Sequence, residues 1–146
     1  MTTAADRRER LDGGGVVHSS EVFTGEPGAI AAARRSVTAF LTRARSSGLQ
    51  PAVTAETLDA AALVVSELVT NAIRHAGGPC GLDLRIEQTA VEITVRDTSP
   101  HRPAVSPQDP TRVGAHGLEI VIALCGGFRT RLTPTGKQIT ARLPLT

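Results

Sequence analysis

The chain has 146 residues, of which 40% are hydrophobic and 21% charged, and a formal net charge of +2. This length predicts one domain that buries a core without metal or disulfide support, and no apolar run is long enough to span a bilayer. The small charge and the absence of tryptophan and tyrosine argue against a nucleic-acid-binding protein. Because the N-terminus lacks the apolar core of a secretory signal, we expect a cytoplasmic protein with no membrane partner.

The first part of the chain predicts a tail, a strand and a helix. Residues 1–15 end in "DGGG" and contain little that a core would bury, so we expect a flexible tail before a domain spanning residues 16–146. Residues 16–23, "VVHSSEVF", have the composition of a strand, which we place at the edge of a sheet. Between Pro27 and Gly48, apolar residues at three-and-four spacing predict an amphipathic helix whose arginines form a solvated face.

A second amphipathic helix is predicted to begin at Pro51 or Thr54 and to end at Gly77. Three further elements follow in chain order: an antiparallel hairpin over residues 80–97, a short buried helix over residues 118–127 and a closing hairpin over residues 128–145. The proline-rich residues 98–117 predict a long functional loop or lid. These elements predict an α+β fold, a two-layer sandwich with helices on one face of a mainly antiparallel sheet.

Three polar residues follow one face of the second helix. Glu67, Asn71 and His75 are four residues apart, so their side chains stack along the helix. The carboxylate and the amide oxygen can converge on a hard cation, and a Mg²⁺ site often takes only one or two protein oxygens besides phosphate oxygens. A polar stripe facing solvent, with His75 capping the last turn, is the alternative.

Two further candidates lie at the ends of the proline-rich loop. Asp97 ends a strand and can accept a hydrogen bond from an exocyclic amine such as that of adenine, or it can cap a turn with Thr98 and Ser99. Gly114 and Gly117 precede an apolar helix, where backbone N–H groups can approach phosphate oxygens. Glycines before a helix are also ordinary features of a loop.

The cysteines and histidines predict neither a disulfide nor a zinc site. Cys80 and Cys125 should stay reduced in a protein that is not exported. No cysteine or histidine has a second ligand at the spacing of a zinc motif.

Taken in order, "SELVTNAIRHA", "VEITVRDTSP" and "GAHGLEIV" resemble the N box, G1 box and G2 box of the histidine-kinase-like ATPases, the GHKL superfamily. Within it, the chain is similar to the anti-sigma factor serine/threonine kinases over about residues 16–146. The resemblance implies a Bergerat-type sandwich that binds ATP and Mg²⁺. It also implies a homodimer that phosphorylates an anti-anti-sigma (STAS) protein and sequesters a sigma factor, and so regulates transcription.

The resemblance also implies roles for individual residues. Glu67 would be the catalytic base that orients or deprotonates the attacking hydroxyl, Asn71 the Mg²⁺ ligand and Asp97 the residue that binds the adenine amine. The nucleotide-binding residues implied in this way are Asn71, Asp97, Gly114, His116, Gly117 and Leu118.

Two departures from the family pattern leave an alternative open. Residues 98–100, "TSP", stand where the G1 box usually continues into glycine, and Gln138 stands where relatives commonly have threonine. The alternative function is a kinase-inactive GHKL module that acts only by binding a partner.

Overall fold

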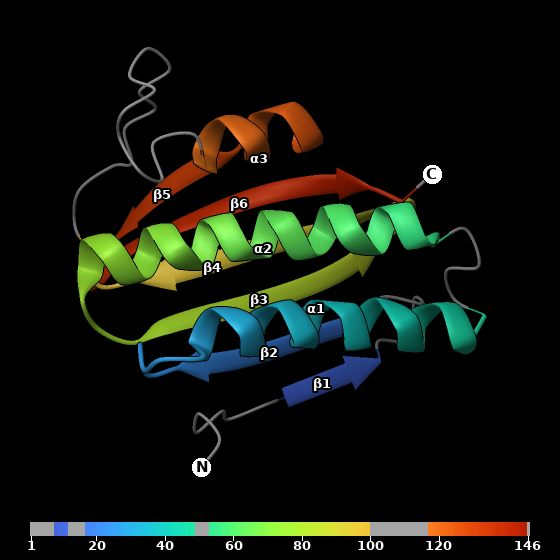
Figure 1. Cartoon of the computed structure of the whole chain (residues 1–146), viewed down its shortest axis with the longest axis horizontal. Coiled ribbons are helices and arrows are strands. Elements are labelled where there is room, and N and C mark those ends of the chain that lie inside the picture. Colours follow the sequence, from blue (N-terminus) through green and yellow to red (C-terminus); the bar gives the residue numbers. More distant parts are fainter. Residues whose placement is uncertain (1–7, 12–16, 49–52, 100–116, 146) are drawn as a thin grey trace.

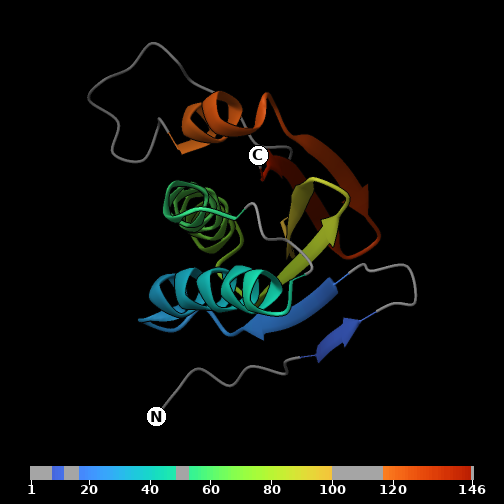
Figure 2. The same cartoon turned by 90° about the vertical axis from the view of Figure 1, so that its right-hand side faces the viewer.

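The protein is described by a computed structural model in which residues 8–11, 17–48, 53–99 and 117–145 are placed. Three helices lie on one face of a six-stranded antiparallel sheet (Figure 1), and the view from the side shows the two layers (Figure 2). This arrangement confirms the predicted α+β sandwich. The loop predicted as a lid falls, from residue 100 to residue 116, outside the described residues.

The helices are α1 (Ala29–Ser46), α2 (Ala55–Ala76) and α3 (Gly117–Cys125). The strands are β1 (Arg8–Leu11), β2 (Val17–Phe23), β3 (Cys80–Glu87), β4 (Ala90–Asp97), β5 (Arg129–Thr133) and β6 (Gly136–Pro144), in the order β1-β2-β3-β4-β6-β5. Each helix of the described part of the chain is too short or too polar to cross a membrane.

The N-terminal edge of the sheet differs from the prediction. Arg8–Leu11, within the expected tail, form β1 and pair with β2 in antiparallel register, so β2 is the second strand and not the edge. A four-residue strand with three charged residues has almost no apolar alternation, which is why its sequence did not indicate a strand. Short, charged strands are typical of sheet edges, where they discourage pairing with other chains.

The boundaries of α2 follow from its capping residues. Thr54 is the N-cap, and its hydroxyl oxygen accepts a hydrogen bond from the backbone N–H of Thr57 at 3.1 Å. Of the two predicted start points, Thr54 is therefore the one used. Gly77 ends the helix with φ of 65°, a left-handed conformation that glycine adopts at little cost.

The core lies between the helices and the sheet. Alternate residues of β3, β4 and β6 face the helices and are buried, while the residues between them face the other side of the sheet. The core includes Phe40 of α1 and Leu68 of α2, both fully buried. This packing fixes the rotation of α2 about its axis and therefore the direction of its polar residues.

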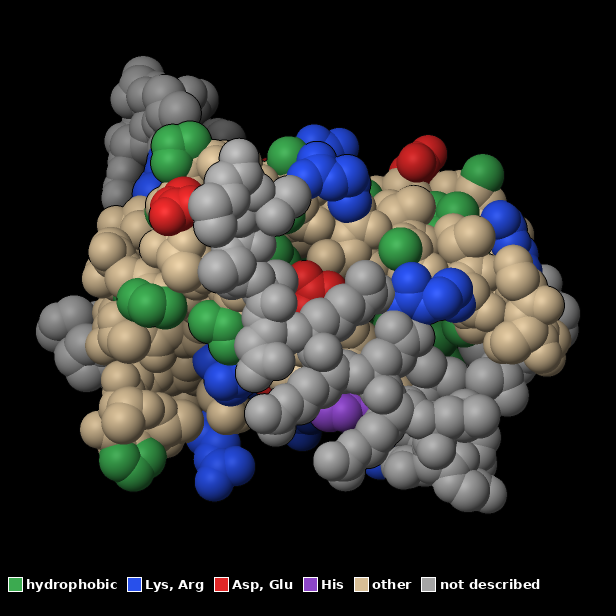
Figure 3. All heavy atoms as spheres, turned by 90° about the horizontal axis from the view of Figure 1, so that it is seen from below, with side chains coloured by type: hydrophobic (Ala, Val, Ile, Leu, Met, Phe, Trp, Pro, Cys, Tyr) green, Lys and Arg blue, Asp and Glu red, His purple; other side chains and the backbone are tan. Residues whose placement is uncertain are grey.

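The arginines of α1 form an exposed face, as predicted. Arg34, Arg35, Arg43 and Arg45 are all exposed. In the view from the β1 side, the basic side chains of the described residues occur in several separate groups (Figure 3). These visible described residues do not form a continuous basic stripe of the kind that follows a nucleic-acid backbone.

Gly136 is required where the β5–β6 turn packs against the end of β4. A Cβ atom at this position would overlap the carbonyl oxygen of Asp97 and lie 2.7 Å from the Cα atom of Thr98. Because both neighbours are backbone atoms, they cannot rotate away. We expect Gly136→Ala to lower the free energy of unfolding by roughly 1–3 kcal/mol, measured by urea denaturation.

Gly78→Ala is the matched control for this substitution. Its added Cβ would lie 3.5 Å from the Thr98 hydroxyl, an ordinary contact. Equal stability of the two variants would contradict the packing argument for Gly136.

Candidate functional site

The three sequence motifs meet at one end of the sheet. The C-terminal half of α2, the end of β4 and the beginning of α3 all lie at this end (Figure 1). Helix α2 packs against both α3 and β4. The fold therefore brings together residues that the sequence places about 20 to 50 positions apart.

Glu67 lies against the first residue of α3. Its side chain is partly buried, and a Cβ atom added to Gly117 would overlap Glu67 Oε2. Position 117 must therefore be glycine for the carboxylate to keep this place. Gly117 acts here through the space that it leaves for Glu67, an effect that the motif alone did not indicate.

Asn71, one turn further along α2, has an unpaired polar atom. Its Nδ2 is buried and has no hydrogen-bond partner among the described residues. Leaving such a donor unpaired costs stability, and unpaired polar groups are typical of sites that bind a ligand. Rotation of the amide by half a turn exchanges Nδ2 and Oδ1, so the side chain can offer a donor to a phosphate oxygen or an acceptor to a cation.

The side chain of Asn71 thus fits a phosphate oxygen or a Mg²⁺ ion that holds phosphates. Mg²⁺ often takes only one or two oxygen ligands from the protein, so the Asn71 oxygen is a sufficient protein ligand. His75, by contrast, is exposed.

Asp97 is buried, with its side chain only 1% exposed, and it is paired with Lys137. Lys137 Nζ donates to Asp97 Oδ1 at 3.0 Å and lies 2.8 Å from Oδ2. The contact with Oδ2 is an ion pair without hydrogen-bond alignment, so Oδ2 itself has no hydrogen-bond donor. The backbone N–H of Ser99 donates to Oδ1 at 2.8 Å. Asp97 therefore also caps a turn, which is the second of the two roles that the sequence allowed for it.

The sequence did not predict Lys137 as a site residue. The departure from the family pattern lies at its neighbour Gln138, which stands where relatives commonly have threonine. Gln138 faces the side of the sheet away from the helices, opposite Arg96 of β4. Lys137 is the only lysine of the chain and shares the inward face of β6 with Ile139 and Ala141. A lysine at an inward position of an alternating strand was the signal that could have identified it.

The other predicted nucleotide-binding residues have different outcomes. Gly114 and His116 lie outside the described residues. Leu118 is 6% exposed and its side chain packs in the core, so only its backbone is free to meet a ligand at the start of α3.

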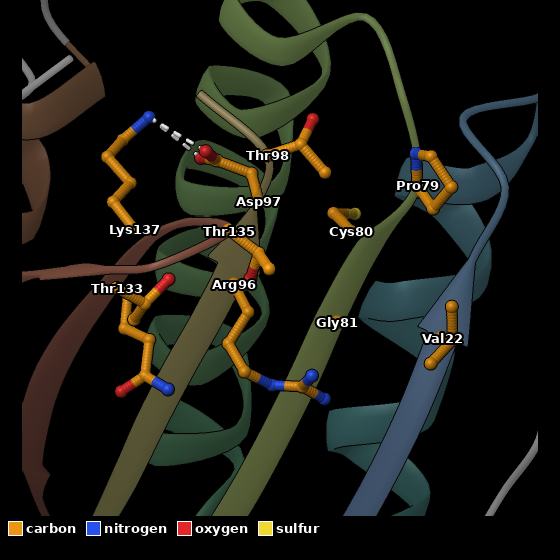
Figure 4. A pocket seen from close by; sticks show the side chains of 11 residues that line it. Val22, Pro79, Cys80, Gly81, Arg96, Asp97, Thr98, Thr133, Thr135 and Lys137 are labelled. Atoms are coloured by element: carbon orange, nitrogen blue, oxygen red, sulfur yellow. Dashed lines mark hydrogen bonds and ion pairs between the residues drawn. The ribbon is translucent and has the colours of Figure 1, made fainter. Parts of the chain in front are cut away.

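A pocket of about 340 Å³ borders Asp97 and Lys137 at the end of the sheet (Figure 4). Thr98, Thr135 and Cys80 also line it, and Arg96 extends across Gly81. Its described lining residues do not include Glu67 or Asn71, which lie on the helix side of the sheet. The pocket is therefore next to the candidate site and does not include the end at which Glu67 and Asn71 lie.

Cys80 and Cys125 are free thiols. Burial raises the pKa of both thiols to about 11, and the Asp97 carboxylate adds to the shift at Cys80 while Arg96 opposes it. The unfolded Cys80 thiol loses its proton near its ordinary pKa of 9.0, whereas the folded thiol keeps it up to about 11. Folding is therefore favoured below this range, and the contribution is lost as the pH rises through it.

This pKa difference predicts a pH-dependent effect of Cys80→Ala. The stability advantage of the wild type should shrink by about 2 kcal/mol between pH 9.0 and pH 11, because each unit of pKa difference corresponds to about 1.4 kcal/mol and part of the change falls outside these two pH values. Urea denaturation of both proteins at the two ends of this range measures the change. Parallel pH profiles would contradict the raised pKa.

Comparison with known proteins identifies the family of the chain. The sequence model of the family described as "Histidine kinase-like ATPase domain" matches residues 23–143, which include α1, α2, α3 and most of the sheet. A search of curated proteins found no match. The family match supports nucleotide binding of the GHKL kind and accounts for the order of the three motifs. The chain therefore belongs to the histidine kinase-like ATPase domain family.

Proposed function

We propose that the protein is a cytoplasmic, ATP- and Mg²⁺-dependent serine/threonine protein kinase of the anti-sigma factor type. It would phosphorylate an anti-anti-sigma (STAS) protein and sequester a sigma factor. The observation that carries the proposal is the pair on α2: a carboxylate held against Gly117 and, one turn away, a buried amide without a partner. The order of the motifs, which resembles that of the anti-sigma factor kinases, supports the choice within the family.

The residues of the site would act chiefly by positioning and by charge. ATP would supply the phosphoryl group, and Mg²⁺ would neutralise the charge of its phosphates. Asn71 would hold the metal or a phosphate oxygen from α2. Glu67 would orient the serine or threonine hydroxyl of the partner and accept its proton, as a general base does. Holding the two reactants in line accounts for much of such catalysis.

Two measurements test the proposal. Calorimetric titration with ATP, with and without Mg²⁺, should show binding that depends on the metal. Transfer of radioactive phosphate from ATP to a purified STAS protein of the same organism should then label a serine or threonine of that protein. Absence of ATP binding by the folded protein would contradict the nucleotide site.

The ion pair at Asp97 favours one alternative. Because Lys137 already pairs with the carboxylate expected to bind the base, the chain can also be a module that regulates by partner binding alone. Tight binding of a STAS protein or sigma factor that survives Asn71→Ala, with no labelled product, would favour this alternative.

A further inference from the structure

The two ends of the candidate site differ in how well their polar groups are paired. At Asn71, the buried donor Nδ2 has no hydrogen-bond partner in the part of the chain that the structure describes. At Asp97, the ammonium group of Lys137 lies within 3.0 Å of both carboxylate oxygens, and Ser99 donates its backbone N–H as well. The pair of side chains is buried, each 1% exposed, so water does not screen it.

A base amine would compete with Lys137 for the same carboxylate. The amine of adenine offers a neutral N–H donor, whereas Lys137 offers a charged one, which adds the attraction between opposite charges to the hydrogen bond. Oδ2 is the one carboxylate oxygen without an aligned donor, yet it lies 2.8 Å from the ammonium nitrogen. Its charge is therefore already balanced, and a neutral amine adds little there.

On the basis of the proposed ATP site, we propose that Lys137 takes the place of the base amine on Asp97. The chain then binds a nucleoside triphosphate through its phosphates and does not read the exocyclic amine of the base. Lys137 is in this view a specificity-determining residue that broadens the range of accepted bases. Figure 4 shows its side chain directed at Asp97, with the ion pair drawn between them.

The wild-type protein tests this inference directly. ATP and purine riboside triphosphate differ only in the 6-amino group, which the second compound lacks. Calorimetry in the presence of Mg²⁺ should give dissociation constants that agree within about twofold, since a hydrogen bond to an already paired carboxylate adds little. A preference of the wild type for ATP of about tenfold or more, the size of effect expected from a hydrogen bond to a free charged group, would overturn the inference.

Lys137→Met should restore discrimination. Methionine keeps the apolar stem and leaves Asp97 without its ammonium partner, so ATP should bind about tenfold more tightly than the analogue. Arg142→Met is the matched control: it removes one positive charge from an exposed position of the same strand and should leave the two affinities alike. If Lys137→Met discriminates no better than this control, the inference is wrong.

Three further outcomes separate the possible failures. If Lys137→Met does not fold, the double variant Asp97→Asn/Lys137→Met takes its place, because it buries no unpaired charge. This variant should also bind ATP more tightly than the analogue, and equal affinities would overturn the inference. If neither triphosphate binds to folded wild type or folded variant, the proposed ATP site fails together with the inference. If the wild type binds ATP with a clear preference over the analogue, only the inference fails.

Discussion

Glu67→Gln should retain ATP binding and lose phosphoryl transfer, with a rate roughly 10² to 10⁴ lower than that of the wild type. Glutamine has the shape of glutamate and can occupy the same space against Gly117, but it cannot accept the proton of the attacking hydroxyl. The affinity for ATP should change little because the phosphates are held by other groups. Calorimetry gives the affinity, and single-turnover transfer to the STAS protein gives the rate.

Glu56→Gln is the control for this effect. Glu56 is exposed and lies in the first turn of the same helix, 11 residues before Glu67. Its replacement makes the same chemical change and should leave both measurements at wild-type values. Equal transfer rates for the wild type and Glu67→Gln would refute the assignment of the base.

Asn71→Ala should abolish the Mg²⁺-dependent part of ATP binding, weakening the affinity by about 100-fold or more. The substitution removes the one side-chain amide that the site can offer to the metal or to a phosphate oxygen, and no other described residue of α2 replaces it. Mutation of a residue that only hydrogen-bonds to a metal ligand typically lowers the affinity for the metal 10- to 100-fold. Loss of the ligand itself should therefore lower it at least as much. Titration of the variant with ATP, with and without Mg²⁺, measures the effect.

A stability measurement shows whether this loss is specific to binding. Because Nδ2 of Asn71 is buried without a partner, its removal relieves an unpaired donor and should not destabilise the ligand-free protein. Thermal unfolding should therefore place Asn71→Ala at or above the wild type. His75→Ala, on the same stripe but exposed, should match the wild type in both assays. A large drop in stability of Asn71→Ala would show that the amide has a structural role instead.

The sequence predicted most of the architecture because the elements carry strong local signals. The periodicity of α2, its Thr54 cap and its terminal glycine identified the helix, and the spacing of Glu67 and Asn71 placed both on one of its faces. Alternating strands predicted the two hairpins, and short connections made them antiparallel. These signals come from residues that are close together in the chain, so a single sequence is enough to predict the helix and the hairpins.

The features that the sequence did not reveal depend on long-range contacts. Strand β1 exists because β2 offers it a partner, and its own four residues show no pattern. The pairing of Lys137 with Asp97 joins residues 40 positions apart, and it arises from the register between β4 and β6. The close approach of the Glu67 carboxylate to Gly117 similarly involves a side chain from another helix. Such contacts follow from the tertiary structure and not from local propensity.

The outer strand β5 limits how copies of this chain can associate. It forms one edge of the sheet, and Arg129 and Arg131 on it are both exposed. If two molecules joined their sheets through these edges, the arginines of one copy would approach those of the other, and like charges on neighbouring strands repel. A continuous sheet across a dimer is therefore disfavoured at β5, and a symmetric pair of molecules would have to meet through another surface.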